Sequence, residues 1–276
     1  MASSEEIETY RGYAAGRYGQ IHYRAAKPVA GDRRSWRTPL ICLHPSPMSG
    51  VVFERFIEAM AIDRIVFAPD TPGYGQSDPP EQPVGIPDFA GVVVDLLDAL
   101  DITTADIMGY HTGSATALEL AQQQPSRINR LVIVSALMHS REEFSEIADF
   151  IEKGAAIPLA EQASNLSERY AFFEEFWPDI PRDETRWRVF FSSHAQAPIS
   201  NWGFRAAFAF DFPEALKKTV HPLLILNPED DVWEVTPRAA PFIRDGHIHD
   251  LPGWNHGFLH SHANETADIV RDFLDS

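Results

Sequence analysis

Residues 105–121 read ADIMGYHTGSATALELA, and this stretch decides the fold prediction. The apolar residues Ile107 and Met108 run directly into a turn-forming segment at 109–113, and a helix-like pattern of Ala and Leu follows at once. A strand that passes through a sharp turn into a helix is the context of a nucleophile elbow, G-x-S-x-G. Gly109 and Gly113 fit that frame, but His111 stands at the position that normally carries serine.

The segments on either side alternate between buried strands and helices. Short, continuous apolar runs are typical of strands that are buried on both faces of a parallel sheet; they occur at 39–43, 64–68, 130–136 and 222–226, with a further strand near 247–251. Helical spacing of apolar residues occurs between them, at 53–60, 89–100, 237–243 and 264–274. The glycine-rich stretch 10–23 predicts an antiparallel hairpin at the sheet edge. This rhythm predicts an α/β fold with a parallel sheet covered by helices on both faces.

The alternation of predicted strands and helices stops between residues 137 and 218. No buried strand is evident there, and aromatic residues and helix formers are frequent. We therefore predict a core of residues 1–136 and 219–276 with an inserted helical cap, residues 137–218. A chain of 276 residues is long enough for one large domain of this kind.

The charge and composition exclude several classes of binding partner. The formal net charge of -17 argues against nucleic acid and anionic membranes, because both require a basic face. Cys42 is the single cysteine, so neither an intrachain disulfide nor a cysteine-based zinc site is expected. The acidic N-terminal stretch does not resemble a signal peptide, and no apolar run is long enough to span a membrane. We expect a cytoplasmic enzyme, monomeric or homodimeric, that acts on a small molecule.

Polar residues gather in the loops that follow the predicted strands. In an open α/β sheet, sites form outside the carboxyl ends of the strands. Convergence of these loops would bring His111, Asp231 and His256 together.

Motifs in these loops resemble, in order, those of an α/β-hydrolase with a helical cap. They are LICLHPSP at 40–47, APDTPGYGQSD at 68–78, GYHTGSATALELA at 109–121, LLILNPEDDVW at 223–233 and LPGWNHGF at 251–258. The chain order of nucleophile, acid and histidine is also that of the family. The resemblance implies a mostly parallel sheet of the eight-stranded type with helices on both faces and an inserted cap.

The same resemblance implies roles for individual residues. His256 is the expected catalytic base and Asp231 the acid that orients it, with Asp230 as the alternative. The expected oxyanion hole consists of the backbone N–H groups of Thr112 and Ser46. Proline replaces the family's usual glycine at position 45, but Ser46 keeps its own N–H.

His111 admits three chemical roles. It could attack a carbonyl and form an acyl-imidazole, because imidazole is a nucleophile that needs no separate base near neutral pH. It could instead position water or the carbonyl while His256 and Asp231 activate water or abstract a proton, as in a cofactor-free lyase. In the third case catalysis is lost and the pocket only binds a ligand.

A metal site at His44, His111 and His256 was the remaining alternative, since zinc accepts three histidines and water. The spacing is not that of metal ligands, so we predict no metal and no cofactor.

The aromatic residues of the cap predict an apolar substrate, aromatic or alicyclic. Trp202, Arg205 and Phe208 fall on one face of a predicted helix and are the expected substrate contacts. Arg205 would pair with a substrate carboxylate or with a cap acid such as Asp211. The elbow lacks the carboxylate that dehalogenases and epoxide hydrolases need. The sequence therefore predicts a hydrolase acting on an ester, a lactone or a C–C bond next to a carbonyl. A cofactor-free lyase and a non-catalytic binding protein are the alternatives.

Overall fold

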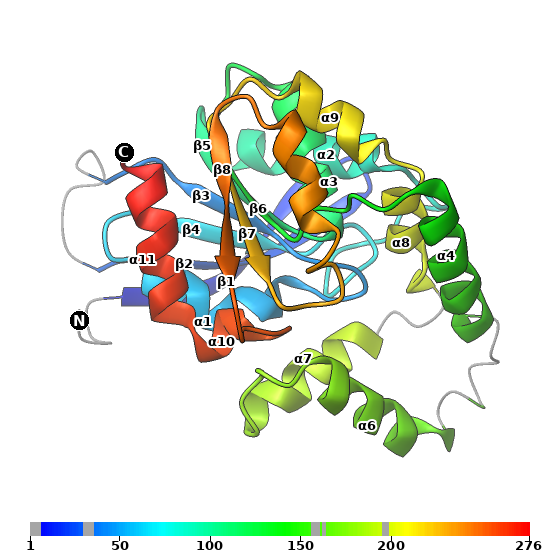
Figure 1. The fold of residues 1–276 in the computed structure, drawn as a ribbon. Helices are drawn as coiled ribbons and strands as arrows, with labels where there is room; N and C mark the ends of the chain where they lie inside the picture. Colours follow the sequence, from blue (N-terminus) through cyan, green and yellow to red (C-terminus); the bar gives the residue numbers. More distant parts are fainter. Residues whose placement is uncertain (1–6, 30–35, 156–160, 162–163, 195–198) are drawn as a thin grey trace.

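The computed structural model describes residues 7–29, 36–155, 161, 164–194 and 199–276. Eight strands form one sheet in the order β1-β2-β4-β3-β5-β6-β7-β8 (Figure 1). Their bounds are β1 (Ile7–Gly16), β2 (Gly19–Pro28), β3 (Leu40–Leu43), β4 (Val66–Pro69), β5 (Ala105–Tyr110), β6 (Ile128–Val134), β7 (Leu223–Pro228) and β8 (Gly246–Leu251). The hairpin of β1 and β2 is antiparallel and lies at the edge, as predicted, and β2 also pairs antiparallel with β4. All later pairs are parallel, which confirms the mostly parallel eight-stranded sheet.

Side chains of the central strands alternate between two apolar clusters, one on each face of the sheet. Along β3, Ile41 and Leu43 belong to one cluster, and Leu40 and Cys42 to the other. This alternation follows from the two-residue period of a strand. Because both faces are covered, these strands are apolar throughout, which made them recognisable in the sequence.

Helices cover both faces. The helices α2 (Ile86–Ala99) and α3 (Thr112–Gln123) pack on one face, and α1 (Glu54–Met60) and α11 (Ala263–Leu274) on the other (Figure 1). The short helices η3 (Gly50–Phe53), η5 (Thr236–Phe242) and α10 (Phe258–Ser261) complete the connections. Strands β3, β5, β6 and β7 are successive parallel neighbours, so their carboxyl ends lie at one edge of the sheet and the loops after them lie near one another.

In the part that the structure describes, the chain between β6 and β7 consists of helices joined by loops. Its helices are α4 (Arg141–Ala155), α6 (Leu166–Phe176), α7 (Glu184–His194), α8 (Trp202–Phe208) and α9 (Phe212–Lys218). Aromatic contacts join α6 and α7, for example the stacked rings of Tyr170 and Trp187 at 4.8 Å. Helices α8 and α9 both pack against α3 of the core. The limits of the cap at 137 and 218 stay a prediction.

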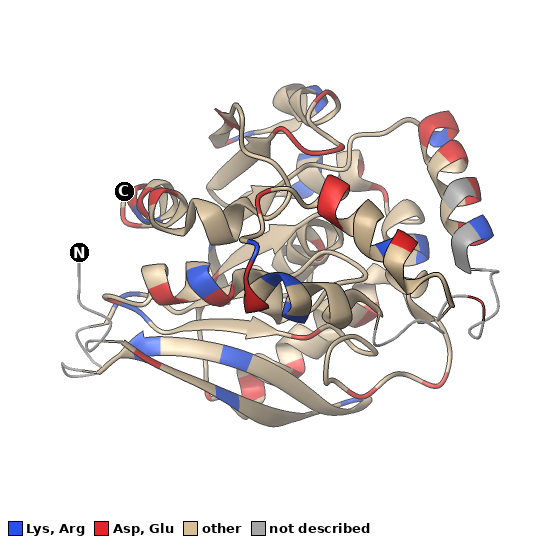
Figure 2. Ribbon diagram, turned by 90° about the horizontal axis from the view of Figure 1, so that it is seen from below, with Lys and Arg blue, Asp and Glu red and all other residues tan. Residues whose placement is uncertain are grey.

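The charged residues are spread over the molecule. Figure 2 shows acidic residues on helices all around the ribbon, with basic residues interspersed, including on the β1–β2 hairpin. Among the described residues, none of the helices is long and apolar enough to cross a membrane.

Asp106, at the start of β5, is a buried carboxylate with an incomplete set of partners. Its Oδ1 accepts hydrogen bonds from Asn129 Nδ2 at 3.0 Å and from the Arg130 N–H at 3.1 Å. Oδ2 has no partner among the described residues. Burial raises the pKa of Asp106 to about 6.

We expect Asp106 to destabilise the fold once it ionises. The folded pKa lies above the unfolded one, so the folded state binds more protons between about pH 4 and 6. Asp106 therefore makes its full contribution to the free energy of unfolding below about pH 4, and this contribution is lost as the pH rises to about 6. Asp106→Asn should be more stable than wild type by about 2 to 3 kcal/mol above pH 6 and equal to it near pH 4. Urea unfolding of both proteins across this range tests the difference; a constant difference would contradict it.

Candidate active site

The elbow has the strained backbone that its sequence predicts. His111, between β5 and α3, has a φ of 48° and a ψ of -109°. A Cβ at position 109 would lie 2.2 Å from the carbonyl oxygen of Gly113, and one at position 113 would lie 2.0 Å from that of Leu43. Only glycine fits at these two positions, because backbone atoms fill the space. The sharp turn therefore presents the His111 side chain at the carboxyl end of the sheet.

His111 is paired with Asp230, which follows β7. His111 Nε2 lies 3.0 Å from Asp230 Oδ2, and the carboxylate side chain is fully buried. Asp230 also accepts hydrogen bonds from the Ser135 hydroxyl and, at 3.0 Å, from the Val232 N–H. These donors hold the carboxylate in one orientation.

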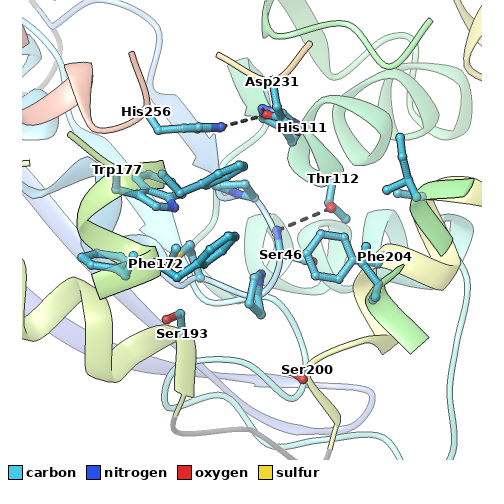
Figure 3. Close-up of a pocket in the computed structure, with 18 of the residues that line it drawn as sticks. Ser46, His111, Thr112, Phe172, Trp177, Ser193, Ser200, Phe204, Asp231 and His256 are labelled. Atoms are coloured by element: carbon cyan, nitrogen blue, oxygen red, sulfur yellow. Dashed lines mark hydrogen bonds and ion pairs between the residues drawn. The ribbon is translucent and has the colours of Figure 1, made fainter. Parts of the chain in front are cut away.

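His256 is paired with the neighbouring acid. Its Nε2 lies 2.8 Å from Asp231 Oδ1 (Figure 3). Its Nδ1 lies 2.7 Å from the Tyr110 hydroxyl. The rings of Phe176 and Trp177 lie against the imidazole, with centroids at 4.6 and 4.7 Å. Both ring nitrogens of His256 are thus engaged by other side chains.

The structure gives a separate histidine to each of the two acids that the sequence treated as alternatives. Asp231 contacts His256, as expected of the orienting acid, and its Oδ1 is also 3.6 Å from His111 Nε2. Asp230 contacts His111, a pairing that sequence reasoning missed. The signal available was the consecutive Asp pair itself, placed directly after a buried strand. Tyr110 was missed as well, although it precedes the elbow.

Nearby charge and burial shift the pKa in opposite directions for His111, Asp230 and Asp231, and in the same direction for Tyr110. Burial lowers the pKa of His111, but the carboxylates of Asp230 and Asp231 raise it, and the net shift is upward. Burial raises the pKa of both carboxyls, but His111 and His256 lower them further, so both lie below their usual value. Burial is the main cause that raises the pKa of Tyr110 well above its usual value, and the nearby carboxylates add to it.

A cavity of about 860 Å³ opens onto this cluster. His111, Asp231 and His256 form one part of its wall (Figure 3). Much of the remaining wall is apolar and comes from the helices between β6 and β7, including Phe172, Phe173, Phe176, Trp177, Phe204 and Phe208. Such a volume fits a small organic molecule.

Ser46 and Thr112 also line the cavity, next to the cluster. The Ser46 N–H points at Thr112 Oγ1 across 3.4 Å, and Thr112 begins α3, where backbone N–H groups lack helical partners. Ser46 and Thr112, whose N–H groups the sequence nominates as oxyanion donors, are therefore neighbours in the cavity wall.

His44 lies apart from the cluster. Its Nδ1 is 3.0 Å from the Pro45 carbonyl oxygen, and its Nε2 accepts a hydrogen bond of 2.8 Å from the Thr71 N–H. The metal arrangement weighed from the sequence, with His44 beside His111 and His256, is therefore not present.

Of the three residues predicted to contact substrate, only Phe208 lines the cavity; Trp202 and Arg205 do not appear in its described wall. Arg205 forms an ion pair with Glu152 on α4, and not with Asp211. Residues three apart on a helix turn by roughly 300°, so the face drifts by roughly 60° at each step. Phe204, four residues before Phe208, lies on the matching face and takes the cavity position.

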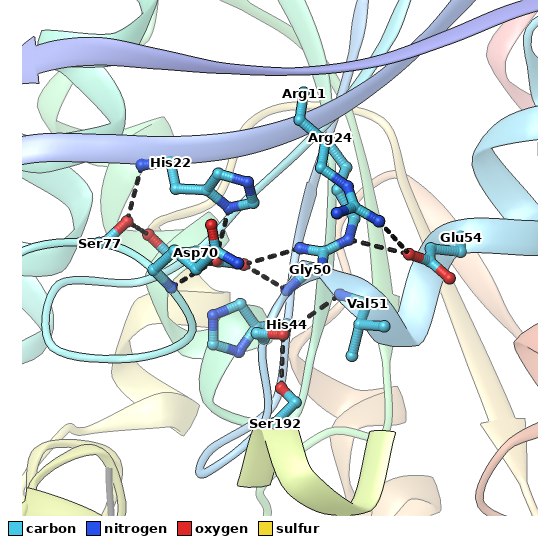
Figure 4. A network of polar contacts seen from close by, with 12 residues as sticks. Arg11, His22, Arg24, His44, Gly50, Val51, Glu54, Asp70, Ser77 and Ser192 are labelled. Carbon is cyan, nitrogen blue, oxygen red and sulfur yellow. Dashed lines mark hydrogen bonds and ion pairs between the residues drawn. The ribbon is translucent and has the colours of Figure 1, made fainter. Parts of the chain in front are cut away.

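Asp70 ties the loop after β3 to the loop after β4 (Figure 4). Its side chain is fully buried. It accepts hydrogen bonds from the N–H groups of Gly50 at 2.8 Å and Gln76 at 2.9 Å, and His22 Nδ1 lies 2.7 Å away. Arg24 lies 3.6 Å away and adds positive charge. This network holds Gly50, which follows the loop after β3, against the loop after β4.

Comparisons with known proteins agree with this architecture. A model of the α/β-hydrolase fold matches residues 38–160. A 2-hydroxymuconate semialdehyde hydrolase of Pseudomonas sp. (strain CF600) is 26% identical over 262 residues, which cover 86% of each chain. An uncharacterized protein of Mycobacterium tuberculosis is 33% identical over 144 residues, 52% of this chain and 40% of that relative, so the chain spans less than half the length of this relative.

A similar solved structure is the enol-lactonase from Burkholderia xenovorans LB400. Its TM-score is 0.76 at 21% identity, and the match covers 96% of this chain and 100% of that one. Sheet order, elbow and the matched family region lead to one conclusion: the chain has the α/β-hydrolase fold.

Proposed function

We propose that this protein hydrolyses an ester, a lactone or a C–C bond next to a carbonyl in a small apolar molecule. The observation that carries the proposal is the pair of His–Asp contacts in the wall of an apolar cavity of about 860 Å³. The aromatic wall favours a cyclic or aromatic substrate. The name of the Pseudomonas relative, a semialdehyde hydrolase, supports the same reaction class.

Among the roles open to His111, the geometry favours a positioning role over covalent attack. Its Nε2 is the ring nitrogen farther from the backbone, and that atom faces the carboxylates of Asp230 and Asp231. Nδ1 has no hydrogen-bond partner among the described residues, but it lies on the backbone side of the ring. We therefore assign the nucleophile to water, with His111 holding the water or the carbonyl.

Asp231 and His256 then accept the proton of the attacking water. Asp231 lines the cavity, and its side chain is 47% exposed, so its carboxylate can meet a water molecule there. His256, which is hydrogen-bonded to it, shares the proton. The water oxygen adds to the carbonyl carbon, the N–H groups of Ser46 and Thr112 stabilise the oxyanion, and the leaving group takes the proton as its bond breaks.

Turnover of an activated aryl ester separates an enzyme from a binding protein. His256→Ala and His111→Ala are each expected to lower kcat/KM by about 100- to 10,000-fold, the range for losing a positioned acid–base group. His139→Ala is the matched control, since this histidine lines the same cavity outside the cluster. Equal, background-level rates in all four proteins would favour the non-catalytic alternative.

Rapid quench and mass spectrometry with a slow substrate separate water from His111 as the nucleophile. We expect an unmodified peptide containing His111, and heavy oxygen from labelled water in the product of a single turnover. An acyl adduct on that peptide would restore the covalent route. A product formed without incorporation of water oxygen would instead favour a cofactor-free lyase.

A further inference from the structure

We propose that His111, Asp230, Asp231 and His256 bind one divalent transition-metal ion of the zinc type. The four residues come from the elbow, the loop after β7 and the loop after β8. Binding of the ion stands on geometry alone, and its use in catalysis rests on the proposed hydrolase function. Replacement of the elbow serine by histidine then has a reason: it adds a ligand to an acid–histidine pair that the fold already positions.

The four ligand atoms lie close together. One nitrogen or oxygen from each side chain can be chosen so that all lie within 4.8 Å of one another. His111 Nε2 is 3.0 Å from Asp230 Oδ2 and 3.6 Å from Asp231 Oδ1, and His256 Nε2 is 2.8 Å from the same Asp231 oxygen. Zinc bonds of about 2.0–2.2 Å in a tetrahedron place neighbouring ligand atoms roughly 3.4 Å apart. The three distances above lie within about 0.6 Å of this value, and the remaining pairs, at no more than 4.8 Å, need side-chain movements of about 1.4 Å at most.

Groups behind the ligands hold them as the outer partners of metal ligands do. Nδ1 of His256 contacts the Tyr110 hydroxyl at 2.7 Å, which leaves Nε2 to point at the shared position. The Ser135 hydroxyl and the Val232 N–H orient Asp230. Such partners set the ring orientation and increase the basicity of metal ligands. The elbow backbone fixes His111 in the same way.

The site also has an open side. Asp231 is 47% exposed and lines the cavity, whereas Asp230 is fully buried beneath it. A catalytic zinc site keeps one position for water, and bound zinc lowers the pKa of that water to about 7. An ion held by all four side chains would take water from the cavity side as a fifth ligand, and would present that water to a substrate. Two imidazoles and two carboxylates favour zinc-type ions over Ca²⁺ and Mg²⁺, which take oxygen ligands.

Calorimetric titration of chelator-treated protein with Zn²⁺ tests the binding directly. We expect one saturable site for Zn²⁺ and no comparable heat with Mg²⁺ or Ca²⁺. Co²⁺ should give the intense visible absorption of a four- or five-coordinate ion, which reports the ligand geometry without any assay of activity. Absence of a saturable site for either transition ion overturns the proposal.

Variants identify the ligands. His111→Ala, Asp230→Asn and His256→Ala should each weaken Zn²⁺ binding by more than the roughly 10- to 100-fold typical of losing an outer partner, and Tyr110→Phe should fall within that range. His139→Ala is the control and should bind as wild type does. Circular dichroism checks that each variant is folded. Unchanged affinity in the folded His111 and His256 variants would place the ion elsewhere.

The same samples separate this inference from the proposed function. If the protein binds Zn²⁺ but neither the chelator-treated nor the Zn²⁺-loaded protein hydrolyses the ester, the metal site stands and the proposed hydrolase function is wrong. If the chelator-treated protein hydrolyses the ester and no Zn²⁺ binds, the proposed hydrolase function stands and the metal site is wrong.

Discussion

His111→Ser, which restores the usual elbow residue, is expected to lower kcat/KM for an activated aryl ester by about 100- to 10,000-fold. A serine needs a neighbouring base to become a nucleophile. His256 does not offer one here, because Asp231 holds its Nε2 and Tyr110 contacts its Nδ1. The serine hydroxyl is also too short to replace the contact between His111 and the buried carboxylate of Asp230. We therefore expect no labelling of the variant by a serine-directed phosphonate.

The control for this variant is His139→Ser, which makes the same change in the same cavity and should retain activity. Rates are measured by stopped assay at equal protein concentration, and labelling by intact-protein mass spectrometry. A gain of activity together with phosphonate labelling of Ser at position 111 would show that the site is an ordinary serine triad with its nucleophile exchanged. That result would falsify the positioning role assigned to His111.

Asp70→Ala is expected to lower the free energy of unfolding by about 3 to 5 kcal/mol. The change removes a fully buried carboxylate and leaves the N–H groups of Gly50 and Gln76 without their acceptor. It also leaves His22 Nδ1 without its partner and removes one of the two carboxylates beside Arg24, the other being Glu54. Breaking a buried charge network from one side costs more than the network contributes as a whole, because the remaining polar groups stay desolvated.

Urea unfolding measures this loss. The matched control is Asp268→Ala, because this carboxylate is 76% exposed and pairs with Arg271 three residues on. That variant should change stability by less than about 0.5 kcal/mol. If Asp70→Ala is as mild as the control, the network does not hold the loops. Asp70→Asn, which keeps an acceptor for one N–H, should fall between the two.

Much of the fold was readable because its signals are local. Each buried strand is a short apolar run, and each covering helix repeats its apolar residues at helical spacing; the predicted helix at 264–274 corresponds to α11 (Ala263–Leu274). The elbow was equally local, since two glycines and a strand-to-helix change define it within a few residues. The order of the strands, in which β4 lies between β2 and β3, was not predicted, because no local pattern specifies it.

Helix α8 shows what cannot be predicted from local sequence. Three residues on α8 were chosen by their spacing, yet one of them lines the cavity and Phe204 was overlooked. Spacing places residues relative to one another on a helix, but packing decides which face turns inward. For Arg205 the deciding partner was Glu152, 53 residues away in the chain.

The sequence by itself determined an α/β sheet with an insertion, and a histidine at an elbow that normally carries serine. The tertiary structure decided how that histidine is used. His111 meets Asp230 across 119 residues of chain, and Tyr110 meets His256 across 146. Asp230 and Asp231 are neighbours in sequence and equal in chemistry, so no local pattern could assign them. Their backbone positions after β7 point one carboxylate into the protein and the other toward the cavity, and this difference in burial separates their roles.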